Sequence, residues 1–156
     1  TGVLNQGTYL RKIKNLKLQQ TLVILDIDNF KDINDNYGHQ LGDSCLCIVS
    51  QAVKSTFGNY GHCYRIGGDE FVMVMRGATE KSVKDKIKKC NEAIKNAEPI
   101  GDIPLSASYG YAWGEGKDID QVIHNADQMM YDNKRQHHKE CYKRDNLNLF
   151  GFLFAV

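Results

Sequence analysis

Hydrophobic residues occur in this chain in two patterns, short unbroken runs and repeats at helical spacing. Unbroken runs bounded by polar residues are typical of buried strands, and repeats every three or four residues are typical of amphipathic helices. Strands are predicted over residues 22–28, 62–66, 71–75 and 105–113, and helices over residues 6–19, 40–56, 79–97 and 118–136. This mixed order predicts an α+β domain in which helices flank a central, mainly antiparallel sheet.

The length of the chain, 156 residues, corresponds to about one domain. We place this domain over residues 1–140, where strands and helices are predicted. Residues 141–156 have no clear hydrophobic period. Two interpretations of this segment stay open, an edge strand of the same sheet and a linker extension.

The charge balance disfavours two classes of partner. Lys and Arg number 20 and Asp and Glu number 19, so the formal charge of +1 gives no overall attraction to a nucleic acid polymer or to an anionic membrane. No apolar run approaches the roughly 20 residues of a membrane span, so we expect no membrane contact by this segment, although a longer parent protein could be membrane-anchored. The cysteines form no C-x-x-C pair and are odd in number, which favours a reduced, cytoplasmic compartment.

Acidic residues gather at two points of the predicted sheet. Asp26 and Asp28 end the first apolar strand, and Asp69 and Glu70 lie in the turn between two strands that should pair as a hairpin. If the hairpin belongs to the same sheet, these carboxylates converge, and a small hard cation such as Mg²⁺ prefers carboxylate oxygens that leave room for water and phosphate. The alternative is that the acids are merely solvated, as is common at strand ends and in turns.

The segment that follows the first strand adds candidates for nucleotide binding. A turn after a strand exposes backbone N–H groups that can bind phosphate oxygens, and Lys31 offers a positive charge there. Asn34 and Asp43 carry the donors and acceptors that suit the edge of a guanine base. Residues of these types also cap helices, so this interpretation stays open as well.

Two motifs resemble those of the GGDEF family of diguanylate cyclases. Residues 67–71 read Gly-Gly-Asp-Glu-Phe, and residues 26–31 read Asp-Ile-Asp-Asn-Phe-Lys at a spacing similar to that of the family's second motif. The resemblance covers about residues 1–140. It implies a ferredoxin-like fold related to nucleotidyl cyclase and polymerase palm domains, and condensation of two GTP molecules into cyclic di-GMP with release of two pyrophosphates.

Carried over residue by residue, the resemblance implies a role for each matching position. Metal ligands are Asp26, Asp69 and the backbone carbonyl of Ile27, and the cofactor is Mg²⁺ or alternatively Mn²⁺. Catalytic roles fall to Asp69, Glu70 and Lys31, with Asp69 as the proton acceptor. The residues expected to bind GTP are Phe30, Lys31, Asn34, His39, Asp43, Arg65 and Lys134.

The resemblance also implies partners. Because each domain holds one GTP, catalysis needs a homodimer with the two sites face to face, and the family's role in bacterial second-messenger signalling implies a sensory domain in a longer parent protein. An alternative function is a catalytically silent module that binds GTP or cyclic di-GMP and regulates a partner domain.

The chain departs from the family at two positions that bear on these functions. His138 replaces an arginine that is common four residues after the position of Lys134, where it would contact phosphate. Residues 58–61 read Gly-Asn-Tyr-Gly and lack the Arg-x-x-Asp of the inhibitory product site. Product feedback through that site is therefore not expected.

Overall fold

The computed structural model of the chain describes residues 3–5, 7, 20–97, 103, 105–114 and 119–153, with side chains of the last helix described up to residue 140. The elements in chain order are β1 (Leu4–Asn5), β2 (Gln20–Ile27), α2 (Phe30–Tyr37), α3 (His39–Phe57), β3 (Gly61–Arg65), β4 (Glu70–Arg76), α4 (Glu80–Asn96), β5 (Ala107–Gly114) and α5 (Ile119–Leu153). The predicted helix over residues 6–19 lies outside the described residues except for Gly7.

The described strands form one sheet in the order β1-β3-β4-β2-β5. β1 runs parallel to β3, and the other pairs, β3 with β4, β4 with β2 and β2 with β5, are antiparallel. The prediction of a mainly antiparallel sheet is therefore confirmed. β2 lies between two neighbours and is buried along almost its whole length, as its unbroken apolar sequence predicts for a strand covered on both faces.

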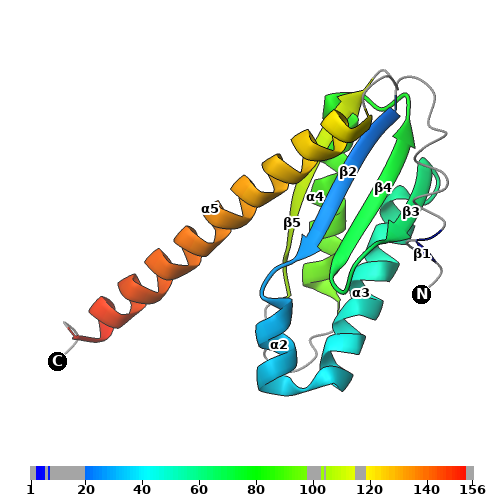
Figure 1. Cartoon of the computed structure of the whole chain (residues 1–156). Coiled ribbons are helices and arrows are strands. Elements are labelled where there is room, and N and C mark those ends of the chain that lie inside the picture. Colours follow the sequence, from blue (N-terminus) through cyan, green and yellow to red (C-terminus); the bar gives the residue numbers. More distant parts are fainter. Residues whose placement is uncertain are drawn as a thin grey trace.

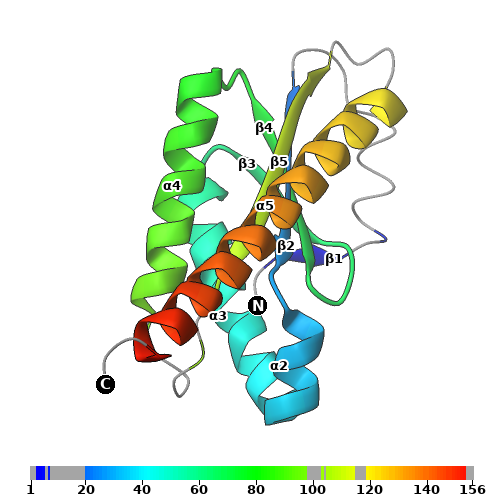
Figure 2. The same ribbon diagram turned by 90° about the vertical axis from the view of Figure 1, so that its left-hand side faces the viewer.

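Helices cover both faces of this sheet, α3 and α4 on one face and α5 on the other (Figures 1 and 2). Because side chains alternate along a strand, Val23 and Leu25 pack under α3 and α4, and Leu22 and Ile24 pack under α5. The opposite faces of one strand thus contribute to two separate hydrophobic cores.

The strand pairing brings the two acidic points of the sequence together. In the antiparallel pair of β2 and β4, Asp26 lies opposite Glu70, and the backbone N–H of Ile27 donates to the carbonyl of Asp69 at 3.2 Å. The predicted convergence is confirmed. The composition of the turn, which begins with Gly67 and Gly68, predicts glycines with positive φ. This prediction is wrong, because the described glycines with positive φ are Gly38 and Gly77, neither of which belongs to the turn.

Two helices differ from the prediction. The segment expected as a turn after β2 forms the helix α2, whose apolar residues Phe30, Ile33 and Tyr37 recur at helical spacing over only eight residues, with Ile33 the single buried one. α5 continues to Leu153 instead of ending near residue 136, and an edge strand over residues 141–153 is therefore wrong. After Met130 none of the side chains described as far as residue 140 is buried, and residues 131–153 contain no proline to end the helix.

α5 projects well beyond the sheet in Figure 1. None of the helices in the described part of the chain combines the length and the apolarity that crossing a membrane requires. A role of residues 141–156 as a linker extension stays a prediction.

Candidate active site

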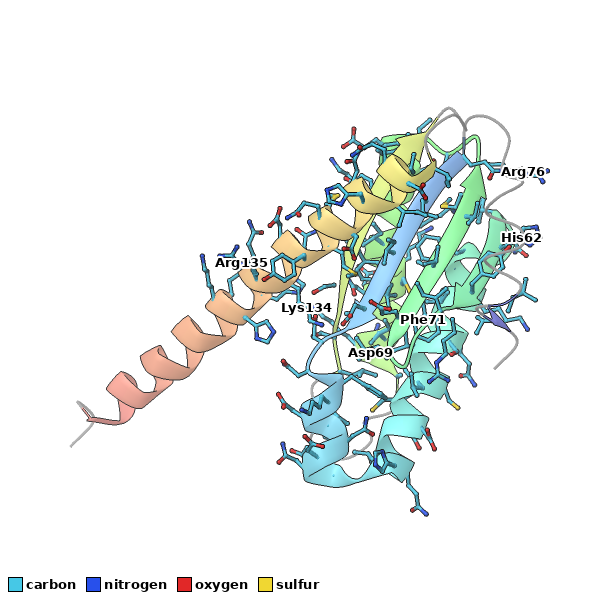
Figure 3. The ribbon with its side chains drawn as sticks, viewed as in Figure 1. His62, Asp69, Phe71, Arg76, Lys134 and Arg135 are labelled. Carbon is cyan, nitrogen blue, oxygen red and sulfur yellow. The ribbon has the colours of Figure 1, made fainter. Side chains whose placement is uncertain are left out.

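Three elements meet at the carboxyl end of β2. Asp26 comes from β2 and is 8% exposed, Asp69 and Glu70 come from the turn between β3 and β4 and the start of β4, and Lys134 comes from α5. The Nζ of Lys134 lies 2.5 Å from Oδ1 of Asp26. Figure 3 shows Asp69 and Lys134 at this same end of the sheet. One lysine and three carboxylates therefore share a small volume.

Burial and neighbouring charges shift the pKa values of the side chains in this site. Burial raises the pKa of Asp26, with further contributions from Asp69 and Asp28, while Lys134 opposes the rise. Burial and the charges of Asp26 and Asp69 also raise the pKa of Glu70. Burial alone would lower the pKa of Lys134, but its hydrogen bond and charge interaction with Asp26 bring the net pKa above the ordinary value. The cluster thus favours an added positive charge.

The donors at this point fit a magnesium ion that is shared with a phosphate. Asp26 and Asp69 offer hard carboxylate oxygens, and Mg²⁺ is typically held by one or two carboxylates together with water and substrate phosphates. No group of three or more histidine, cysteine, aspartate or glutamate side chains among the described residues could by itself hold a metal. A magnesium ion held here would therefore take part of its ligands from the protein and the rest from water and a nucleotide.

Asp28, the remaining acid of the strand end, is bound to neighbouring side chains. Its Oδ2 accepts a hydrogen bond from Ser106 at 2.7 Å and its Oδ1 accepts one from Ser108 at 2.6 Å. Nδ1 of His137 lies 3.4 Å from Oδ2. Sequence reasoning missed these three partners, because they lie 78 or more residues away and only the pairing of β2 with β5 and the packing of α5 bring them close.

The turn between β3 and β4 is held by Arg65 and by a close contact at Gly67. The guanidinium of Arg65 donates to the carbonyl of Gly68, with Nη2 at 2.7 Å and Nε at 3.2 Å. A Cβ at Gly67 would lie 2.8 Å from Oε2 of Glu70, whereas a Cβ at Gly68 would meet nothing within 4 Å. Arg65 thus shapes the turn that carries Asp69, and its role in binding GTP stays a prediction.

The residues expected to bind guanine lie in the corner between α2 and α3. The side chain of Asn34 lies directly against Gly42, where a Cβ would approach its Oδ1 to 2.0 Å, so Asn34 is close in space to the neighbour of Gly42 in the chain, Asp43. His39 begins α3 directly after Gly38, whose φ of 87° turns the chain between the two helices. Asp43 and His39 are exposed and accessible to a ligand.

Phe30 and Lys31 occupy the first turn of α2. The first N–H groups of a helix have no partner within the helix and favour anions, and Lys31 is exposed there. The chain enters this turn through Asn29 in the left-handed conformation, with φ 54°. This turn of the chain joins the end of β2, which carries Asp26, to the start of α2, which carries Lys31.

A charge-neutral variant tests the acidic character of this cluster. Because the pKa of Glu70 is raised in the folded protein, its ionised form costs stability above the folded pKa, and this cost disappears below the unfolded pKa of about 4.3. We expect Glu70→Gln to melt at a higher temperature than the wild type at pH 7 without magnesium, and the difference to vanish near pH 4. Thermal unfolding at both pH values measures this, and a lower melting temperature at pH 7 would contradict it.

Comparisons with known proteins show to which family this chain belongs. The model of the family described as diguanylate cyclase, GGDEF domain, matches residues 5–140. Over 147 residues the chain is 34% identical to the diguanylate cyclase DgcZ of Escherichia coli, covering 91% of this chain and 49% of that protein. It is 36% identical over 124 residues to the diguanylate cyclase DosC of Escherichia coli, covering 74% of this chain and 26% of that protein.

A solved structure gives the same picture at the level of the fold. The diguanylate cyclase SiaD of Pseudomonas aeruginosa, in complex with its activator SiaC, superposes with a TM-score of 0.79 at 26% identity, over 87% of this chain and 56% of that one. The chain thus spans about half of the length of DgcZ and about a quarter of DosC. The family match covers most of the 156 residues, and the chain belongs to the GGDEF family of diguanylate cyclases.

Proposed function

We propose that this domain condenses two GTP molecules into cyclic di-GMP and that it does so as a homodimer. The observation that carries the proposal is the meeting of Asp26, Asp69 and Lys134 at the end of β2, beside the α2–α3 corner that holds Asn34 and Asp43. Relatives that are 34% and 36% identical bear the name diguanylate cyclase, which supports the same reaction.

The reaction joins the 3′-hydroxyl oxygen of one GTP to the α-phosphorus of the other. The bond between the α-phosphorus and the bridging oxygen breaks, pyrophosphate leaves, and the hydroxyl proton passes to a base, the role proposed for Asp69. A second reaction of the same kind closes the ring. Catalysis of such a transfer rests on alignment and on neutralisation of the charge on the phosphates.

The side chains divide this work. Lys134 and Lys31 supply positive charge for the triphosphate, and Asn34 and Asp43 offer the acceptors and donors for the guanine edge. Mg²⁺ held by Asp26, Asp69 and the carbonyl of Ile27 would neutralise phosphate charge and lower the pKa of the attacking hydroxyl. Glu70 lies opposite Asp26 in the sheet and adds negative charge that favours a cation.

A homodimer follows from the size of the site. Within the described residues one domain offers one corner for guanine and one set of acids, which supports two copies with their sites facing each other as the arrangement that brings two GTP molecules together. The monomer is expected to bind GTP and to release no product. We expect a sensory domain in the same protein to control how the two copies meet. Relatives that are two to four times longer than the matched region support this expectation.

The test is a product assay on a dimer of defined composition. The domain is fused at its N-terminus to a parallel coiled coil, supplied with GTP and Mg²⁺, and the products are separated by chromatography. We expect cyclic di-GMP and pyrophosphate from the fusion and about a hundredfold less from the unfused domain, because proximity supplies much of the rate. GTP binding without product by the fusion would favour the silent regulatory module, and a mixed product from GTP with ATP would contradict the guanine role of Asp43.

A further inference from the structure

The placement of Lys134 depends on how α5 sits on the sheet. The acids come from β2 and from the turn before β4, whereas Lys134 belongs to a different element and carries its charge on a flexible four-carbon stem. Such a side chain does not fix its own position. The contacts that hold this turn of α5 therefore decide whether Nζ reaches Asp26 and its surroundings.

The apolar packing of α5 ends before Lys134. Gly110 of β5 allows close approach, because a Cβ there would lie 1.8 Å from the carbonyl oxygen of Ala126. Beyond Met130, no residue in the part of α5 with described side chains is buried. Among the described side chains of the helix, the buried apolar residues are Val122, Ala126 and Met130. Hydrophobic packing thus positions the first half of α5 but leaves the turn with Lys134 to other contacts.

Past this point, polar side chains on the same side of the helix make the contacts with the sheet, although the side chain of His137 is 48% exposed. Asn133 and His137 follow Met130 at three and seven residues, which places them on the same side. Nδ2 of Asn133 donates to the carbonyl of Tyr109 at 2.7 Å. This bond ties α5 to the backbone of β5 one residue before Lys134.

His137 contacts two buried side chains, those of Ser108 and Asp28. Its Nδ1 lies 3.2 Å from Oγ of Ser108 and 3.4 Å from Oδ2 of Asp28. Ser108 and Asp28 are 0% and 7% exposed. The backbone N–H of Asp28 also donates to the carbonyl of Ser106 at 3.0 Å, so the acceptors of His137 belong to the packed interior.

The hydrogen bonds around Ser108 indicate which nitrogen of the His137 ring carries a proton. A serine hydroxyl has one proton, and Ser108 gives it to Oδ1 of Asp28 at 2.6 Å. Oγ must therefore accept from His137, and Nδ1 carries a proton whether the ring is neutral or charged. His137 thus donates to the Ser108 and Asp28 pair from one side, as Asn133 donates to Tyr109 from the other.

We propose that Asn133 and His137 are positioning residues that hold α5 on β5 at the level where Lys134 meets the acidic site and the triphosphate. This inference rests on the proposed function for the role of Lys134 toward GTP. Lys134 lies between the two residues in sequence, so one contact on each side fixes the turn that carries it. Neither residue needs to touch the nucleotide.

The test removes the donor of His137 and then restores it. His137→Leu keeps bulk without a hydrogen bond, whereas the side-chain amide of His137→Asn places an N–H near the position of Nδ1. With a non-hydrolysable GTP analogue and Mg²⁺, we expect calorimetry to give about tenfold weaker binding for His137→Leu and binding within about twofold of wild type for His137→Asn. His124→Leu, at an exposed histidine of the same helix, is the matched control and should bind like the wild type.

A double-mutant cycle separates positioning from general destabilisation. If His137 acts through Lys134, then His137→Leu should have no further effect in a Lys134→Ala background, because interacting residues are not additive. Additive losses, or equal losses in His137→Asn and His137→Leu, would overturn the proposal.

A structural measurement keeps the inference independent of the proposed function. Crystal structures of wild type and His137→Leu should differ in the contact of Lys134 with Asp26, which we expect to be lost in the variant. An intact contact in the variant would overturn the positioning role. Absence of GTP binding by the wild type would instead contradict the proposed function, while the crystal structures would still decide the role of His137.

Discussion

Replacing Asp69 by asparagine is expected to lower the rate of cyclic di-GMP synthesis by the dimeric fusion about a thousandfold. Asparagine keeps the size of the side chain but removes the charge proposed to bind magnesium and the base proposed to accept the hydroxyl proton. Loss of one group that stabilises charge in a transition state commonly costs a factor of a hundred to a thousand, and loss of a metal ligand adds to it. Steady-state product formation, followed by chromatography, measures the effect.

The matched control for this variant is Asp85→Asn. Asp85 is an exposed acid in the middle of α4, so the same chemical change there should leave synthesis within about twofold. Asp69→Asn should also melt no lower than the wild type, because it removes one charge from an acidic cluster. Synthesis by Asp69→Asn within tenfold of wild type would show that Asp69 is neither a metal ligand nor the base.

The second large effect is expected at Gly110, where β5 and α5 touch. A Cβ at this position would lie 1.8 Å from the carbonyl oxygen of Ala126 and 2.5 Å from the N atom of Met130. Both atoms belong to backbone, so neither can rotate away. We expect Gly110→Ala to cost about 2–3 kcal/mol of folding free energy and to lower the melting temperature by about 6 °C.

A displacement of α5 by the added Cβ should also move Lys134 away from the site, since Lys134 lies one helical turn beyond Met130. We expect Gly110→Ala to weaken binding of the GTP analogue even at temperatures where it stays folded. Gly68→Ala is the control for stability, because a Cβ there meets nothing within 4 Å, and its unfolding free energy should lie within about 0.5 kcal/mol of wild type. Equal melting temperatures for Gly110→Ala and wild type would mean that α5 can move away from β5 at no cost.

The sequence predicted those parts of the fold whose hydrophobic pattern is strong. β2 is an unbroken apolar run, and α3 and α4 have clear helical periods, so each was found within a few residues of its ends. Cys45 and Cys90 belong to the apolar positions of these two helices, and both are buried. The closeness of Asp26 and Glu70 could also be expected, because a hairpin that pairs with β2 brings its turn next to one end of that strand.

The remaining features depend on contacts that local sequence does not record. α2 is only eight residues long and buries a single one of them, so its apolar spacing is too short to tell a helix from a turn. In α5 none of the side chains described between residues 131 and 140 is buried. The contacts of His137 could not be predicted, because its partners, Ser108 and Asp28, are distant in sequence. A histidine seven residues after the buried Met130, on the same helical face, is the one local signal that could have drawn attention to it.

The pairing of β2 with β4 has a consequence for how this domain tolerates insertions and deletions. Side chains alternate between the faces of a sheet, so a shift of one residue would turn Asp26 toward the opposite face and bring an apolar side chain to the site. Leu22 and Ile24 share the face of Asp26, and Val23 and Leu25 occupy the other. The same shift would turn the side chains of both hydrophobic cores to the wrong faces of the sheet and unfold the domain. Variants with an insertion or deletion that still fold must therefore keep Asp26 and Glu70 aligned.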